Sequence, residues 1–253
     1  MTHVKQYGST GPNLIIIHGL FGNADNWHSI AQSLAENFTV YCVDLPNHGK
    51  SAPMEEASYP KMAEAVLAWA EQADLPSFYL LGHSMGGKVA MQMASLTNKI
   101  EKLIVVDIAP VDYQASHTTI LEGLQVLKGQ TFTSRKDADK VLAQYEPNMA
   151  VRQFLLKNLS KTQQGLVLDL AVEQIADAYP TILKKPQLTL GNPLSTLFIK
   201  GEHSDYIIAD YQDAIMDAFP NASFKILAGT GHWLHAEKPI PFTGLVRRFL
   251  LDG

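Results

Sequence analysis

The sequence predicts an α/β fold, in which a mostly parallel sheet is flanked by helices and a helical cap is inserted. Three observations support this prediction. Short apolar segments rich in β-branched residues alternate with helical patterns along most of the chain. The alternation stops for about eighty residues that carry mainly helical patterns, which is long for a plain connection. One apolar segment runs directly into a glycine-flanked serine and then into a helical pattern.

Six segments are predicted to be strands because each is short, apolar and bounded by turn residues. They are NLIIIHG (13–19), FTVYCVDL (38–45), FYLLGHS (78–84), KLIVVDIA (102–109), STLFIKG (195–201) and SFKILAG (223–229). Helical patterns lie between or after them, near residues 24–36, 61–74, 85–97, 206–219 and 240–251. Such alternation indicates βαβ units, which form a parallel sheet with helices on both faces.

The alternation is interrupted between Ala109 and Gly191. This stretch contains four helical patterns: TTILEGLQVLKG, RKDADKVLAQYE, MAVRQFLLKNL and LVLDLAVEQIADAY. Long insertions with structure of their own often form lids over a site. We therefore predict a core made of residues 1–112 and 193–253, and a helical cap made of residues 113–192.

Composition and charge exclude several classes of function. The chain has 253 residues and a net charge of −5, and its basic pairs at 184–185 and 247–248 are isolated. Binding to nucleic acid or to an anionic membrane is therefore not expected. No apolar run approaches membrane-spanning length, and the polar segment MTHVKQYGSTG lacks the apolar centre of a signal peptide. The single cysteine, Cys42, excludes an internal disulfide framework, so a cytoplasmic protein is expected.

Ser84, in the segment GHSMGGK (82–88), is the predicted nucleophile. The pattern G-x-S-x-G lies between a predicted strand and a predicted helix, the context in which it marks a serine on a sharp turn. Gly82 and Gly86 occupy the two positions where such a turn leaves no room for a side chain. A glycine-rich packing turn is the alternative interpretation. His83 is expected to point away from Ser84 and to pack.

His232 is the predicted general base. It follows the last predicted strand, in LAGTGHWLHAEKP, at the same sheet edge as Ser84. Ligands bind at this edge in sheets of this kind, and a nucleophilic serine needs an imidazole within hydrogen-bonding reach. His235 is expected to lie at the start of the last helix. Three other histidines have the pattern of ordinary surface or helix residues: His3, His28 and His117.

The segment IIIHGLFGN, which ends the first predicted strand, is expected to help form an oxyanion hole. Acyl transfer needs two N–H donors aimed at the tetrahedral oxygen. One is expected from Met85, the residue after the nucleophile, and the other from the loop after this early strand. Leu20 is the preferred residue on that loop, with Phe21 second.

The orienting carboxylate has more than one candidate. Asp107 ends the buried segment KLIVVDIA, where a carboxylate is costly to bury unless a charged or hydrogen-bonding group meets it. We expect it to meet His232. Asp205, in GEHSDY, is the alternative acid, and Glu202 and Asp112 are the next candidates after it.

These segments also resemble a known family. HGLFGNADNW, DLPNHGKS, GHSMGGK, VVDIAPVDY and AGTGHWLHAEKP are together similar to the abhydrolase-domain esterases of the α/β-hydrolase superfamily. The resemblance implies the α/β-hydrolase fold, with Ser84 as nucleophile, His232 as base and Asp107 as acid. It also implies that Ser204 stands where the superfamily's acid usually lies, with Asp205 one position late.

The predicted function is a serine esterase that forms an acyl-enzyme. The resemblance implies small-molecule esters and acyl-CoA thioesters as substrates. Apolar residues beside the catalytic groups predict a pocket for acyl chains, bounded by Phe21, Trp233, Phe154 and Met85. No cofactor or metal is expected. A C–C bond hydrolase or lyase using the same residues, or a small-molecule receptor with slow turnover, is the alternative function.

Overall fold

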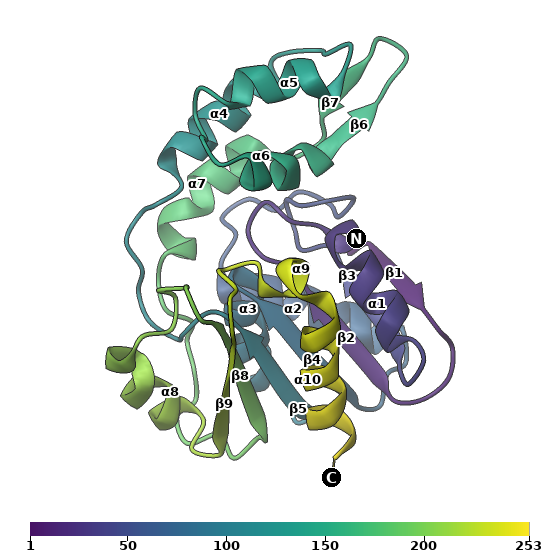
Figure 1. Cartoon of the computed structure of the whole chain (residues 1–253). Helices are drawn as coiled ribbons and strands as arrows, with labels where there is room; N and C mark the ends of the chain where they lie inside the picture. Colours follow the sequence, from purple (N-terminus) through teal and green to yellow (C-terminus); the bar gives the residue numbers. More distant parts are fainter. Residues whose placement is uncertain (253) are drawn as a thin grey trace.

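A seven-stranded sheet forms the centre of the molecule (Figure 1). The computed structural model of the chain describes residues 1–252. In spatial order the strands are β1 (Val4–Tyr7), β3 (Thr39–Val43), β2 (Asn13–Ile17), β4 (Phe78–His83), β5 (Ile100–Val106), β8 (Thr196–Gly201) and β9 (Ala222–Leu227). Strand β1 pairs antiparallel with β3, and every other pair is parallel. The carboxyl ends of the parallel strands therefore meet at one edge of the sheet.

The central strands are apolar on both faces because helices cover both. Along β2, Ile15 and Ile17 belong to one buried cluster, whereas Leu14 and Ile16 belong to the other. This is the alternation of side chains expected of a strand. Helices α2 (Tyr59–Gln72), α3 (Met85–Ala94) and α8 (Gln212–Ala218) cover the first face, and α1 (His28–Leu34) and α10 (Pro239–Leu251) cover the second.

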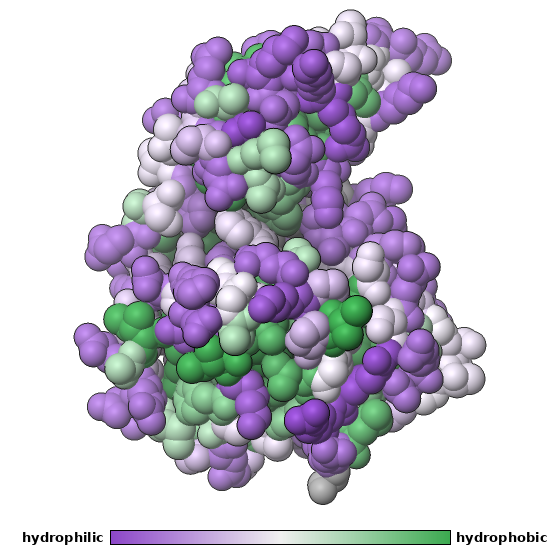
Figure 2. All heavy atoms as spheres, in the orientation of Figure 1, coloured by the Kyte–Doolittle hydropathy of each residue, from purple (hydrophilic) through white to green (hydrophobic). Residues whose placement is uncertain are grey.

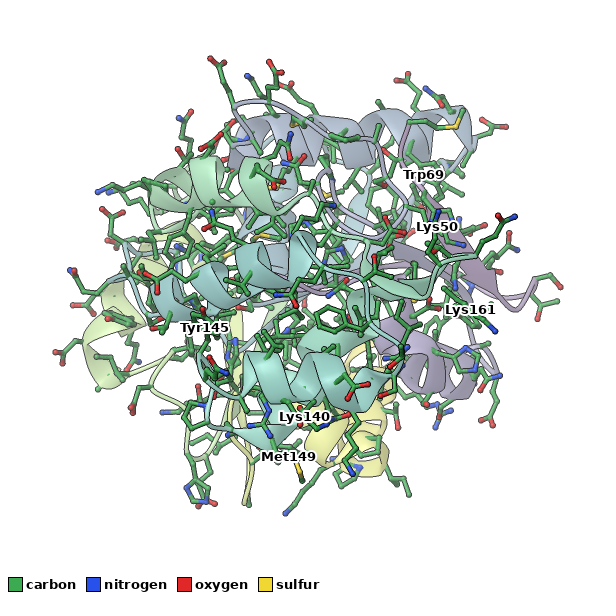
Figure 3. The ribbon with its side chains drawn as sticks, turned by 90° about the horizontal axis from the view of Figure 1, so that it is seen from above. Lys50, Trp69, Lys140, Tyr145, Met149 and Lys161 are labelled. Atoms are coloured by element: carbon green, nitrogen blue, oxygen red, sulfur yellow. The ribbon has the colours of Figure 1, made fainter. Side chains whose placement is uncertain are left out.

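The cap lies over the carboxyl-end edge of the sheet, between β5 and β8 in the chain (Figure 1). Its helices are α4 (Thr118–Lys128), α5 (Arg135–Leu142), α6 (Met149–Leu155) and α7 (Val172–Ile182). They bury an apolar cluster of their own, which Phe21 joins from the loop after β2. Seen from above, the cap covers much of the sheet, and the labelled Lys140 and Met149 are exposed on it (Figure 3).

The six predicted strands are all present, and two features were not predicted. Strand β1 was missed because it is a half-buried edge strand with little apolar content. The cap is not entirely helical: β6 (Leu159–Lys161) and β7 (Leu166–Leu168) form an antiparallel hairpin where two of its helical patterns were expected to continue. Three-residue strands are too short to show a period of two, and Gly165, at φ +140°, makes the turn between them possible.

Across residues 1–252, no helix combines the length and the apolar character that crossing a membrane requires.

A buried lysine connects the core to the end of the cap. Lys88 lies on α3, whose residues are all buried, and is 2% exposed. Its Nζ donates to the backbone oxygens of Lys184 (2.7 Å) and Leu183 (3.4 Å), and it lies 4.7 Å from the centre of the Tyr113 ring. Burial lowers the pKa of Lys88 to about 7.

This burial predicts a pH-dependent contribution to stability. Between the folded pKa of about 7 and the ordinary value of 10.5, the unfolded chain binds more protons at this site than the folded chain. The contribution of Lys88 to the free energy of unfolding is therefore fully present above the pKa of the unfolded chain. It is lost as the pH falls to and through the pKa of the folded chain. We expect the free energy of unfolding to rise from pH 7 to pH 9 by more in the wild type than in Lys88→Met, as measured by urea denaturation. The exposed Lys61 supplies the control, since Lys61→Met should keep the wild-type pH response, and an equal rise in all three proteins would contradict the prediction.

Candidate active site

Ser84 occupies a strained turn between β4 and α3. Its backbone has φ 54° and ψ −123°, a conformation that non-glycine residues rarely adopt. A Cβ atom added at Gly82 would lie 2.2 Å from the backbone oxygen of Gly86, and one added at Gly86 would lie 2.3 Å from that of His18. The structure therefore confirms that both flanking positions require glycine. The turn presents the Ser84 hydroxyl at the carboxyl-end edge of the sheet.

His232 reaches Ser84 from the loop between β9 and the short helix α9 (Leu234–Glu237). Its Nε2 lies 3.0 Å from Ser84 Oγ. The His83 side chain is buried against Trp27 and His235, and it hydrogen-bonds the backbone oxygen of His232 through Nε2, at 2.9 Å. The Tyr206 ring stacks on the imidazole, with ring centres 4.0 Å apart. These contacts hold the base in place from two sides.

Asp107 meets His232, and it is fully buried. Its Oδ2 accepts a hydrogen bond from His232 Nδ1 at 2.7 Å and another from the Ser204 hydroxyl. Its Oδ1 accepts from the backbone N–H of Gly201 at 3.0 Å. Asp107 also has a positive φ, 54°, which turns its side chain toward these partners. Three donors offset the cost of burying a carboxylate in an apolar strand end.

The other candidate carboxylates lie elsewhere. Asp205 is exposed at the rim of the cavity and makes no hydrogen bond to another described residue. Glu202 accepts from the backbone N–H of Gly229 at 2.6 Å, and Asp112 pairs with Lys184 at 3.2 Å. Among the described residues, none of these three forms a hydrogen bond or ion pair with His232, so Asp107 is the carboxylate that the structure brings to this imidazole.

The loop after β2 lies against the serine. A Cβ added at Gly19 would be 3.1 Å from Ser84 Cβ. In the described part of the chain, the backbone N–H groups of Leu20 and Met85 donate no hydrogen bond. The N–H of Phe21 is engaged, because it donates to His48 Nε2 at 3.2 Å. Two unpaired donors beside a serine hydroxyl could bind an oxygen anion.

His48 supports this loop as a neutral side chain. Burial lowers its pKa to about 3. Its Nδ1 lies 2.9 Å from the backbone oxygen of Pro46, so Nδ1 donates there and Nε2 accepts from Phe21. His48 belongs to the motif DLPNHGKS, which thus positions the loop that carries Leu20.

A cavity of about 630 Å³ lies between the cap and the sheet edge, above Ser84. The residues expected to bound it all line it: Phe21, Met85, Phe154 and Trp233. In the space-filling view the surface narrows between the cap and the core (Figure 2). The cavity has the size of a small-molecule site and mostly apolar walls.

Sequence reasoning missed three residues at this site. His117 lines the cavity from the cap, although its pattern suggested an ordinary surface or helix residue. Tyr206 stacks on His232, and Asn158 ties the cap to the loop that carries Phe21. Only position in the folded chain distinguishes them, because a lone His, Tyr or Asn in a helical or loop segment carries no motif. His235, by contrast, lies on the separate helix α9 and stacks on Trp27, with ring centres 4.3 Å apart.

Within residues 1–252, no group of three or more His, Cys, Asp or Glu side chains is arranged to hold a metal ion.

The fold and the serine–histidine–aspartate cluster define the class of protein, and comparison with known proteins agrees. Residues 12–239 match the family model of the α/β hydrolase fold, so the chain belongs to that family. The resemblance to the abhydrolase-domain esterases is thereby confirmed, and its relatives indicate a hydrolase.

Three relatives place the chain within this family. Esterase YbfF of Escherichia coli is 33% identical over 94% of this chain and 93% of its own length. The sn-1-specific diacylglycerol lipase ABHD11 of Danio rerio is 35% identical over 94% of this chain and 78% of its own. The solved structure of a marine microorganism esterase superposes with a TM-score of 0.93, at 36% identity over 98% of both chains.

The link between the cap and the Phe21 loop can be tested by stability. Asn158 is 4% exposed; its Nδ2 donates to Phe21 O at 2.8 Å, and its Oδ1 accepts from Asn23 Nδ2 at 3.1 Å. Asn158→Ala leaves these buried partners unsatisfied, so we expect the free energy of unfolding to fall by about 1–3 kcal/mol in urea denaturation. Asn221 supplies the control, because its bond to Pro193 O is exposed and Asn221→Ala should have much less effect. Equal losses in both variants would contradict the assignment of Asn158 as a buried link.

Proposed function

We propose that the protein is a serine esterase that hydrolyses carboxylic esters through an acyl-enzyme. The observation that carries the proposal is the continuous chain from Ser84 Oγ to His232 Nε2 (3.0 Å) and from His232 Nδ1 to Asp107 Oδ2 (2.7 Å). It lies under an apolar cavity that can hold a substrate. Serine nucleophiles are activated by this arrangement in unrelated folds.

Each group has a role in the proposed reaction. Ser84 Oγ attacks the acyl carbonyl while His232 takes the hydroxyl proton, and Asp107 stabilises the imidazolium that forms. The N–H groups of Leu20 and Met85 bind the oxyanion. His232 then protonates the departing alcohol, and the acyl group remains on Ser84. Water attacks this acyl-enzyme with His232 as base, which releases the acid and restores the serine.

The cavity supports a preference for unbranched acyl chains. Phe21, Met85, Phe154 and Trp233 offer apolar surface on its walls, which suits an aliphatic tail. We include acyl-CoA thioesters in the proposed substrate range, since thioesters undergo the same acyl transfer. We assign residues 113–192 as the cap that covers the acyl chain. The single, buried Cys42 is compatible with the cytoplasm as the proposed compartment.

Ser84→Ala should abolish turnover and leave the fold intact. Removing the nucleophile of a cooperative catalytic group costs at least about 10³-fold in kcat. The measurement is steady-state hydrolysis of p-nitrophenyl butyrate, with circular dichroism to verify folding. Ser160→Ala, on the cap hairpin, is the control and should retain the wild-type rate. Wild-type turnover by folded Ser84→Ala would overturn the mechanism, and a wild-type burst that stops after one equivalent would indicate a receptor.

Asp107→Asn should harm catalysis far more than Asp205→Asn. Asparagine keeps the shape of the acid but lacks its charge, and its amide can favour the wrong histidine tautomer. We expect kcat to fall by at least about 10²-fold for Asp107→Asn. Asp205 is exposed, so its charge is screened and Asp205→Asn should cost less than about tenfold. Both kcat values are measured near pH 8, and a larger loss in Asp205→Asn would move the acid to the turn after β8.

A further inference from the structure

One polar side chain of the cap lies in the cavity that also holds Ser84 and His232, and the proposed mechanism does not use it. His117 is the residue immediately before α4. Its ring packs edge-on against Phe21, with ring centres 6.0 Å apart, and against Tyr179, at 6.1 Å. Phe21 follows Leu20, whose N–H is proposed to bind the oxyanion. His117 is therefore held beside the reacting groups by packing from the core and from the cap.

The hydrogen bonds around Tyr179 determine which nitrogen of His117 carries the proton. Tyr179 Oη accepts from the backbone N–H of Ser116 at 3.1 Å and from that of His117 at 2.9 Å. A phenol oxygen that accepts twice has only its own O–H left to donate. His117 Nδ1 lies 3.2 Å from Tyr179 Oη and is the acceptor for that O–H, and the Ser116 hydroxyl, also 3.2 Å from Nδ1, can donate to the same nitrogen. Nδ1 is thus unprotonated, and the proton of the neutral ring is on Nε2.

The ring is neutral near neutral pH. Burial, reinforced by the charge that His232 carries when protonated, lowers the pKa of His117 to about 4. Among the described residues, His117 Nε2 has no hydrogen-bond partner. This nitrogen is not fully buried, so a bound molecule can reach it. The cavity therefore contains an uncharged N–H donor that no protein group satisfies.

We propose that His117 is a substrate-binding residue whose Nε2–H donates a hydrogen bond to a second, uncharged oxygen in the alcohol part of the ester. This inference rests on the proposed esterase function and extends it to the leaving group. The alcohol departs beside His232, which protonates it, and His117 lines the same cavity as His232. A neutral donor suits an ether, hydroxyl or carbonyl oxygen. The substrate class is therefore esters of glycol-like alcohols, in preference to plain alkyl esters.

Isosteric pairs of esters test this proposal. 2-Methoxyethyl butyrate and butyl butyrate differ by one oxygen in place of a methylene in the alcohol. Butyl 3-methoxypropanoate and butyl pentanoate differ in the same way in the acyl chain. For each pair the ratio of kcat/KM, ether over alkyl, is measured in wild type, His117→Phe and His117→Gln. Comparing the enzymes on the same pair cancels the intrinsic reactivity of the esters.

We expect His117→Phe to lower the alcohol-side ratio by about three- to tenfold, the effect of one uncharged hydrogen bond. His117→Gln, which keeps an N–H donor at similar reach, should recover at least half of that loss on a logarithmic scale. The acyl-side ratio should not change. A purely structural role would slow both esters of a pair equally and leave both ratios unchanged. Unchanged alcohol-side ratios, or a change confined to the acyl-side pair, would overturn the proposal.

Binding separates this proposal from the proposed function. Ser84→Ala holds esters without reacting, so dissociation constants of 2-methoxyethyl butyrate and butyl butyrate can be compared in Ser84→Ala and in the double variant with His117→Phe. The same loss of preference is expected there. If the wild type hydrolyses none of the esters, the esterase mechanism fails, and binding still decides the role of His117. If hydrolysis is normal, and the substitution of His117 changes neither the kcat/KM ratios nor the binding preference for the ether ester, only the His117 proposal fails.

Discussion

The site depends on one buried carboxylate. Asp107 is 0% exposed at the end of a central strand, where an ionised group is tolerated only if donors surround it. The parallel pairing of β5 with β8 brings Gly201 and Ser204 to that carboxylate. The loop after β9 brings His232. Three neighbouring strands must therefore be in register before the carboxylate is satisfied, which couples the formation of the sheet to the geometry of the site.

Histidines around the site have different roles because their surroundings differ. His232 bridges a serine hydroxyl and a carboxylate. His48 and His83 are buried without a carboxylate partner, their pKa values are lowered by desolvation, and they act as neutral hydrogen-bonding groups toward Phe21 N and His232 O. His117 has the same neutral character but faces the cavity. Burial thus converts a residue type that often carries charge into a set of oriented, uncharged donors and acceptors.

The cap contributes more than a cover for the cavity. Its apolar cluster continues into Phe21, and Asn158 donates to the backbone oxygen of the same residue. The segment that leads from the cap back to the sheet is held by α3. Lys88 and Gln92 of this helix donate to the backbone oxygens of Lys184 and Gln187. Since α3 begins directly after Ser84, both ends of the cap are connected to elements that carry the proposed catalytic groups. A displacement of the cap would therefore be transmitted to the loop that carries Leu20 and Phe21 and to α3.

The sequence by itself determined the six parallel strands of the sheet and the turns that carry Ser84, Leu20 and His232. Six strands, the Ser84 turn and the loops carrying Leu20 and His232 could be predicted because apolar periodicity and glycine spacing are local properties. Local pattern could not identify β1, which is half-buried and has little apolar content, or the cap hairpin, whose strands are too short to show a period. It also left Asp107 and Asp205 as rival acids, since both follow predicted strands. Only the tertiary structure shows that Asp107, and not Asp205, hydrogen-bonds His232. Only it reveals His117 and Asn158, because the contacts that place them, His117 with Tyr179 and Asn158 with Phe21, join residues 62 or more positions apart. Contacts of that kind depend on how the cap folds and how it docks on the sheet, which no local pattern encodes.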